Sequence, residues 1–150
     1  MIKLKRTTSE DEDFIALVEQ LDTYLAVIDG DEHAFYNQFN KIDKIKHVII
    51  AYQNDTAIGC GAIKELASNT MEVKRMFTSP AGRKKGVATT VLAALEEWAS
   101  ELGYKVCVLE TGIKQADAIS LYHKCGYQSI PNYGQYVGIE NSVCFEKEMK

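Results

Sequence analysis

The stretch Arg83-Lys84-Lys85-Gly86-Val87-Ala88 joins a predicted strand to a predicted helix, and it decides how the chain is interpreted. A helix that begins after such a loop directs several free backbone N–H groups at one place, and its dipole favours an anion there. Gly86 allows a close approach of the backbone to a ligand, and the small Ala88 leaves the helix start uncrowded. Because the basic side chains stand in a chain of formal net charge −4, the stretch predicts a site for a polyvalent anion.

The same stretch can also be interpreted as a surface loop without a ligand, since basic residues before a helix with one glycine are often only solvated surface. Two better-known phosphate-binding patterns, GxGxxG and GxxxxGK[ST], do not occur in the sequence. A dinucleotide-binding Rossmann fold and a P-loop nucleotidase are therefore excluded.

Outside this stretch, the hydrophobic pattern alternates between the periods of strands and helices and predicts a mixed α/β chain. Ser9 and Glu12 match a capping box at the start of a first helix. Polar turns separate the apolar runs in the middle of the chain, which predicts an antiparallel meander. The predicted strands cover residues 2–6, 48–52, 57–63, 71–78, 105–110, about 127–130 and 142–147. The predicted helices run from Ser9 to about Ile28 and over 33–39, 87–102 and 116–124.

Composition limits the classes of function. A length of 150 residues, 46% of them apolar, fits one domain. No basic face is expected for nucleic acid or anionic membranes, and no apolar segment is long enough to span a bilayer, so we expect a cytoplasmic protein. The four cysteines are widely spaced in apolar runs and are predicted to be reduced core thiols, and the three histidines lack metal-site spacing, so no metal is predicted.

Two ordered motifs carry a family resemblance. Arg83-x-x-Gly86-x-Ala88 resembles the [RQ]xxGx[GA] motif of the GNAT superfamily of N-acetyltransferases. Residues 118–127, AISLYHKCGY, resemble the family segment AixLYxkxGF at the expected distance downstream. The resemblance covers roughly residues 72–130. It implies a GNAT-like fold, in which a mixed, mostly antiparallel sheet splits into a V around acetyl-CoA and is flanked by about four helices.

The resemblance also implies a set of cofactor contacts. Coenzyme A would lie between the strand that ends at Thr78 and the strand that ends at Glu110, and backbone groups of Met76 and Thr78 would pair with its pantetheine arm. Gln115 stands seven positions before Tyr122, where the family commonly has a cofactor-binding asparagine. The implied cofactor-binding residues are Met76, Phe77, Thr78, Arg83, Lys84, Lys85, Gly86, Val87, Ala88, Thr89, Gln115 and Tyr122.

Two residues are candidates for catalysis. By its place in the family motif, Tyr122 protonates the departing thiolate of coenzyme A; the alternative is a tyrosine that packs its helix against the sheet. Glu72 matches the position of a family glutamate that deprotonates the attacking ammonium. Its alternative is a strand-end charge paired with Lys74 or Arg75, and Glu110 is the reserve candidate for the base.

The expected activity is transfer of acetyl from acetyl-CoA directly to the primary amine of a small molecule, such as an amino acid or a polyamine. Tyr133, Tyr136 and Glu110 are the candidate acceptor contacts, the two tyrosines because of their loop context. The alternatives are acetylation of a peptide or protein N-terminus and a non-catalytic acyl-CoA-binding module. Nucleic acid and membranes are not expected partners, and a homodimer is an expectation from the family alone.

Overall fold

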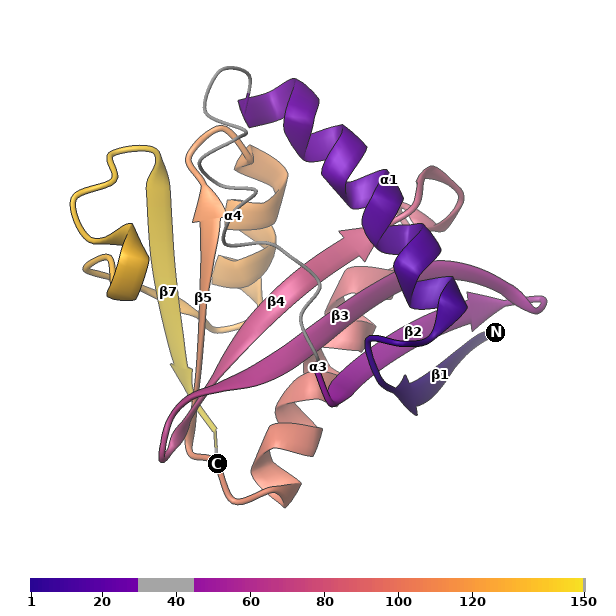
Figure 1. Ribbon diagram of the computed structural model, residues 1–150, viewed down its shortest axis with the longest axis horizontal. Helices are drawn as coiled ribbons and strands as arrows, with labels where there is room; N and C mark the ends of the chain where they lie inside the picture. The colour runs from indigo at the N-terminus through magenta and orange to yellow at the C-terminus, as the bar shows by residue number, and fades with distance from the viewer. Residues whose placement is uncertain (30–44, 150) are drawn as a thin grey trace.

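In the computed structural model, which describes residues 1–29 and 45–149, the strands form one seven-stranded mixed sheet (Figure 1). Their order is β1-β2-β3-β4-β5-β7-β6. The pair β4–β5 is parallel, and the other neighbouring pairs are antiparallel. The strands are β1 (Ile2–Thr7), β2 (His47–Gln53), β3 (Thr56–Ala67), β4 (Thr70–Thr78), β5 (Val106–Gly112), β6 (Gln128–Ile130) and β7 (Ser142–Glu148).

Helices cover both faces of this sheet. Figure 1 shows α1 (Glu12–Asp29) in front of the sheet, with α3 (Val87–Glu101) and α4 (Ala116–Lys124) behind it. The predicted α/β fold with a mixed, mostly antiparallel sheet is confirmed. Strand β3 extends beyond the predicted end at residue 63, and β5 extends beyond 110. The helix expected over 33–39 lies outside the described residues.

The predicted capping box at Ser9 and Glu12 is wrong. Helix α1 begins at Glu12, and the carboxylate of Asp11 accepts the Asp13 amide at 2.9 Å, so Asp11 caps the helix. The Ser9 hydroxyl instead accepts the amide of Ile45 at 3.0 Å, while the Ser9 amide donates to the Ile45 carbonyl at 2.9 Å. Ser9 therefore joins the end of β1 to the segment that leads into β2, a long-range contact that local sequence does not reveal.

Two hydrophobic clusters lie on the two faces of the sheet. Phe14, Leu17, Val18 and Leu21 of α1 pack on Val48 and other side chains of the central strands. The larger cluster behind the sheet joins the apolar side of α3 to Tyr122 of α4, Tyr127, and Phe145 of β7. Most of the periodic apolar positions of α1 and α3 are thus buried, as their spacing predicts. Leu102, predicted as the last apolar position of the second of these helices, instead lies just past the end of α3 and is 43% exposed.

All four cysteines are free thiols, as predicted. Cys60, Cys107 and Cys144 are buried, and Cys125 is half-buried. Burial raises the pKa of the Cys60 and Cys107 thiols to about 12. These two thiols therefore stay protonated and unreactive near neutral pH.

Strands β4 and β5 separate soon after they meet. Their parallel pairing covers only Thr70–Val106, Met71–Cys107 and Glu72–Val108, after which the strands diverge toward their carboxyl ends (Figure 1). Between its pairs with Ala62 and Cys60 of β3, β4 contains one extra residue, and Arg75 there has a φ of 60°. Such a bulge bends its strand. The predicted V between these two strands is therefore present.

Helix α3 lies very close to β3 at two glycines. A Cβ at Gly61 would lie 2.5 Å from Met76 Sδ and 2.8 Å from Leu95 Cδ1, and one at Gly59 would lie 2.5 Å from Val87 Cγ1. The glycines that break the apolar pattern of this strand are thus the places where the helix contacts the sheet.

Replacing Gly61 with alanine should destabilise the fold. The added methyl group overlaps the half-buried Met76 of β4 and the buried Leu95 of α3, and overpacking of this kind costs about 1–3 kcal/mol. Urea unfolding would measure the loss. Ala93→Ser adds one heavy atom on the exposed side of α3 and should change the unfolding free energy little, so equal effects of the two substitutions would contradict this packing.

Candidate active site

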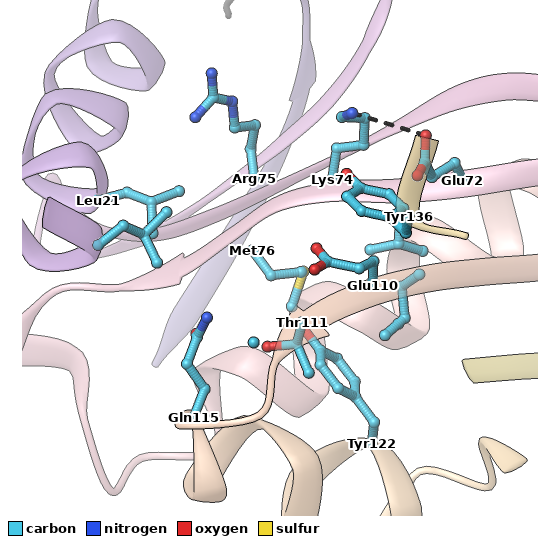
Figure 2. Close-up of a pocket in the computed structure, with 14 residues that line it drawn as sticks. Leu21, Glu72, Lys74, Arg75, Met76, Glu110, Thr111, Gln115, Tyr122 and Tyr136 are labelled. Atoms are coloured by element: carbon cyan, nitrogen blue, oxygen red, sulfur yellow. Dashed lines mark ion pairs between the residues drawn. The ribbon is translucent and has the colours of Figure 1, made fainter. Parts of the chain in front are cut away.

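A cavity of about 90 Å³ occupies the opening between β4 and β5 (Figure 2). Helix α1 contributes two leucines to its lining, β4 and β5 form its walls, and α4 and the loop before β7 contribute side chains. Its lining residues are Leu21, Leu25, Glu72, Val73, Lys74, Arg75, Met76, Leu109, Glu110, Thr111, Gly112, Gln115, Tyr122 and Tyr136. The structure thus brings together the two predicted catalytic residues and Met76, Glu110, Gln115 and Tyr136 from the other predicted sets.

Strand alternation places the charged side chains of the cavity on the face that α1 covers. Met71 and Val73 of β4, like Cys107 and Leu109 of β5, belong to the cluster behind the sheet. Because successive side chains of a strand point to opposite faces, Glu72 and Lys74 of β4 and Glu110 of β5 face α1. Tyr122 reaches the cavity from α4 on the other face, so the two predicted catalytic groups approach it from opposite sides.

Glu72 is 7% exposed and is held by two partners. The Tyr133 hydroxyl donates to Glu72 Oε2 at 2.7 Å, and Lys74 Nζ lies 3.7 Å from Glu72 Oε1 (Figure 2). Burial and the nearby Glu72 carboxylate raise the pKa of Tyr133 above its ordinary value, so Tyr133 remains a hydrogen-bond donor. From the sequence, pairing with Lys74 is an alternative to a catalytic role of Glu72. The structure contains this ion pair, and Glu72 also lines the cavity.

Arg75 points from the bulge of β4 toward α1. Its side chain is 2% exposed, and Nη1 lies 3.1 Å from Oδ1 of Asp22. This ion pair fixes α1 across the opening of the V. Sequence reasoning considered Lys74 and Arg75 only as partners of Glu72 and missed both of them, with Thr111, as cavity residues.

Glu110 lies between the tyrosines of the cavity. Figure 2 shows its carboxylate beside Met76, below Tyr136 and above Thr111 and Tyr122. Burial raises the pKa of Tyr136, and Glu110 is the first of the charges that raise it further, ahead of Glu72. Tyr136 is 3% exposed and packs edge-on against Tyr133, with ring centroids 5.8 Å apart. The two tyrosines named as acceptor contacts therefore stand next to the two carboxylates.

Tyr122 is both a packing residue and a cavity residue. Its ring lies 5.9 Å from the Tyr127 ring and 6.0 Å from the Phe145 ring, in the cluster behind the sheet. Figure 2 shows it pointing from α4 toward Thr111. Burial raises its pKa above the ordinary value of a phenol, and the nearby Cys125 and Glu110 raise it further. Tyr122 therefore keeps its proton at neutral pH and can give it to a stronger base.

The start of α3 leaves its backbone donors available. Gly86 caps the helix with a φ of 74°, preceded by Lys84 with a φ of 64°. Within the described part of the chain, the amides of residues 84–89 donate to no backbone carbonyl outside α3, while the Arg83 amide bonds Pro80 at 3.4 Å. A Cβ at Gly86 would meet no atom of the described protein within 4 Å. The glycine is thus favoured by its left-handed backbone, and the space beside it is open.

The basic side chains beside this helix start are exposed, as expected. Arg83 lies over the Tyr24 ring, 5.8 Å from its centroid, and Lys85 Nζ donates to Gln53 Oε1 at 2.7 Å. Among the predicted cofactor contacts, Phe77 and Val87 are 9% and 1% exposed and pack in the two hydrophobic clusters. These two residues can therefore contact a cofactor mainly through their backbones.

The comparison with known families agrees with this geometry. Residues 13–127 match the model of the Acetyltransferase (GNAT) family. The chain belongs to this family. GNAT enzymes of this kind are acetyl-CoA-dependent N-acetyltransferases, and the open helix start and the V between β4 and β5 suit that cofactor.

Several relatives of the GNAT family resemble the chain over most of its length. The IAA acetyltransferase of Azospirillum brasilense is 31% identical over 137 residues, which cover 90% of each chain. The crystal structure of an acyl-CoA N-acyltransferase from Klebsiella pneumoniae is 30% identical with a TM-score of 0.83, covering 99% of this chain and 97% of its own. The PaiA N-acetyltransferase of Thermoplasma acidophilum, solved with coenzyme A, shares the fold with a TM-score of 0.73 at 18% identity, covering 99% of each chain.

The described residues contain neither a candidate metal site nor a candidate membrane span. Within 1–29 and 45–149, no cluster of three or more His, Cys, Asp or Glu side chains has the arrangement of a metal site. No helix in the same ranges is both long and apolar enough to cross a membrane.

Replacing Tyr133 with phenylalanine should destabilise the protein, because the buried Glu72 carboxylate then loses its hydroxyl donor. Loss of one partner of a buried hydrogen bond costs about 1–3 kcal/mol. Tyr104→Phe is a matched control, since the Tyr104 hydroxyl donates to Glu65 in an exposed position. Thermal or urea unfolding should show the larger loss for Tyr133→Phe, and an equal loss would argue against a structural role of the buried bond.

Proposed function

We propose that this chain transfers acetyl from acetyl-CoA directly to the primary amine of a small molecule. The observation that supports this proposal is the placement of a protonated phenol, Tyr122, and two carboxylates, Glu72 and Glu110, around one cavity. The reaction needs one group that accepts a proton from the amine and one that gives a proton to the leaving thiolate. The small volume of the cavity favours a small acceptor over a peptide end.

The backbone of the chain provides the proposed cofactor contacts. The amides of residues 84–89 hold the diphosphate at the start of α3, with Arg83, Lys84 and Lys85 around it. The edge of β4 over 73–78, which β5 leaves unpaired, offers main-chain groups to the pantetheine arm. Bound acetyl-CoA supplies the thioester whose carbonyl carbon the amine attacks and whose thiolate leaves. Gln115 lines the same end of the cavity as Tyr122 and is a further proposed contact.

Tyr122 is the proposed acid. Its phenol proton passes to the leaving sulfur as the carbon–sulfur bond breaks. The raised pKa has the sign that this role needs, because the group stays protonated throughout the neutral range and beyond the ordinary pKa of tyrosine. The phenolate formed after transfer regains a proton from solvent.

Glu110, the reserve candidate from the sequence, is the proposed base, and Glu72, the first candidate there, is now the second. Glu110 lies near the centre of the cavity, and its charge acts on both Tyr122 and Tyr136. Glu72 is already bound by Tyr133 and paired with Lys74, so its carboxylate is held at the wall where β4 and β5 meet. In this arrangement the amine loses its proton to a carboxylate on the α1 side, and Tyr122 gives up its proton on the opposite side.

Acetyl-CoA-dependent thiol release with a panel of primary amines and amino acids tests the proposal, together with the variant Tyr122→Phe. Loss of the acid should lower kcat about 10²–10⁴-fold while the Kd for acetyl-CoA changes by about threefold or less. Calorimetry measures the Kd, and the release assay measures kcat.

Tyr127→Phe is the matched control for this variant. Tyr127 is a buried neighbour of Tyr122 outside the cavity lining, and its hydroxyl donates to Glu96 at 3.0 Å. The Tyr127→Phe variant should be less stable than the wild-type protein and should keep its kcat. A non-catalytic acyl-CoA-binding module would instead bind acetyl-CoA and release no thiol with any amine, and unchanged kcat in Tyr122→Phe would remove Tyr122 from the mechanism.

The variant Gly86→Ala tests whether the start of α3 binds the diphosphate of the cofactor. A left-handed alanine costs about 1–2 kcal/mol, and its methyl group would occupy the space proposed for the diphosphate. We expect the Kd for acetyl-CoA to rise about tenfold or more, because backbone donors lose close contact with a charged ligand.

Gly103 follows the other end of α3 and provides the control. It has a φ of 93°, and a Cβ there would also meet no described atom within 4 Å. Gly103→Ala should therefore lose a similar amount of stability but bind acetyl-CoA normally. Equal affinities of the two variants would contradict a diphosphate contact at Gly86.

A further inference from the structure

The loop between β6 and β7, residues 131–141, carries Tyr133 and Tyr136. Its two ends meet where β6 pairs with β7. From there the Tyr133 hydroxyl reaches past β5 to Glu72 of β4, at 2.7 Å, and Tyr136 lines the cavity. The conformation of this loop therefore decides where two side chains of the site lie.

Asn132 holds the loop with its side-chain amide. Its Nδ2 atom donates to the backbone carbonyls of Tyr136 at 3.1 Å, Ile139 at 3.0 Å and Ser142 at 3.0 Å. Carbonyl oxygens can only accept, so the nitrogen of the amide must face them. Because this nitrogen has two hydrogens, one of them is shared between two carbonyls. A single half-buried side chain thus joins three points of the loop.

The backbone of the loop forms short local turns. The Tyr136 amide donates to the Tyr133 carbonyl at 2.9 Å, the Ile139 amide to Tyr136 at 3.0 Å, and the Ser142 amide to Ile139 at 3.1 Å. Each of these bonds spans only three residues of chain. Asn132 uses the second lone pair of the Tyr136 and Ile139 carbonyls and so ties the turns to one another.

We propose that Asn132 is a positioning residue for the acceptor side of the active site. It acts through the loop, which holds Tyr136 in the cavity wall and keeps the Tyr133 hydroxyl on the Glu72 carboxylate. The inference rests on the proposed function, because it concerns the acceptor contacts of that same site. A displacement of about 1 Å in an active site can lower the rate about 10²-fold, so the loss of these bonds should be measurable.

The two tyrosines couple Asn132 to the carboxylates of the cavity. Their rings pack edge-on with centroids 5.8 Å apart, so a shift of one ring displaces the other. Tyr136 is 3% exposed and has little room to move without a change of the cavity. The start of α3, where we propose that the diphosphate binds, is formed around Gly86 and not by this loop. Asn132 should therefore affect the acceptor and not the cofactor.

The variant Asn132→Ala tests this separation on the whole protein. We expect kcat/KM for the best primary amine of the panel to fall about 10- to 100-fold, while the Kd for acetyl-CoA changes by about threefold or less. Tyr127→Phe is the control, because it also loses a side-chain hydrogen bond but lies outside the cavity lining. It should keep both constants below its melting temperature. Equal losses of kcat/KM in the two variants would overturn the inference.

A double-mutant cycle tests whether Asn132 acts through Tyr133. The product of the losses of kcat/KM in Asn132→Ala and Tyr133→Phe should exceed the loss in the double variant by about threefold or more, because both substitutions disturb one unit. A purely structural role of Asn132 predicts independent losses, whose product equals the loss in the double variant. Independent losses would therefore contradict the inference.

The variant Asn132→Asp separates the hydrogen bonds from the volume of the side chain. It is nearly isosteric, but its carboxylate has no donor for the three carbonyls. At neutral pH its loss of kcat/KM should equal or exceed that of Asn132→Ala, and near-wild-type activity would show that these bonds do not position the site. If neither variant folds, Asn132 supports the whole protein rather than the acceptor side, and the inference is wrong.

NMR of tyrosine side chains distinguishes this inference from the proposed function, because it needs no substrate. In folded Asn132→Ala the ring resonances of Tyr133 and Tyr136 should shift, and unchanged resonances would overturn the inference whatever the activity. If they shift while amine turnover is unaffected, the inference fails and the proposed function stands. If wild-type protein acetylates no amine, the proposed function fails, and Asn132 holds the two tyrosines without an acceptor role.

Discussion

The active site depends on how briefly β4 and β5 pair. Parallel hydrogen bonding joins them over Thr70, Met71 and Glu72 of β4 and then stops, although β4 continues to Thr78 and β5 to Gly112. Each strand keeps its other neighbour, β3 or β7, so the sheet remains continuous while it opens in the middle. The opening exposes main-chain groups of β4 and creates the cavity. The same divergence of the strands provides the proposed cofactor groove and the space for the acceptor. Longer pairing of β4 with β5 would therefore close the groove and the cavity together.

The bulge at Arg75 couples this opening to α1. Its extra residue bends β4, and its left-handed conformation is uncommon for a residue with a side chain. The side chain then reaches Asp22 of α1, so one ion pair joins the strand that opens to the helix that covers the opening. On the other face, Gly59 and Gly61 bring α3 close to β3. The cavity is therefore held between two helices whose positions depend on particular residues of neighbouring strands.

Local sequence patterns predicted most of the fold and much of the site, because the residues concerned follow strand or helix periods. The start of α3, with Gly86 at its cap and open amides behind it, could be predicted because one short segment contains the whole feature. Ser9 could not, since its partner Ile45 is distant in sequence. Lys74 and Arg75 were missed as cavity residues for a similar reason. Lys74 alternates with Met71 and Val73, a pattern that normally indicates a solvent face, and only tertiary structure shows that α1 covers it. Arg75 would share the face of Val73 in a regular strand, and only the bulge turns it toward α1.

The arrangement of charges follows from the two tasks of the site. Transfer to an amine needs a carboxylate close to the nucleophile and a protonated group close to the leaving sulfur, and these demands conflict if both groups share one environment. The sheet separates the two groups that we propose for these tasks, with Glu110 on the α1 face and Tyr122 on α4 behind it. Burial affects the protonation of both groups. It keeps a phenol protonated without a counter-charge, whereas a buried carboxylate needs hydrogen-bond donors or cations nearby. Tyr133 and Lys74 meet that need for Glu72, so the cations are part of what allows two carboxylates to share one small cavity.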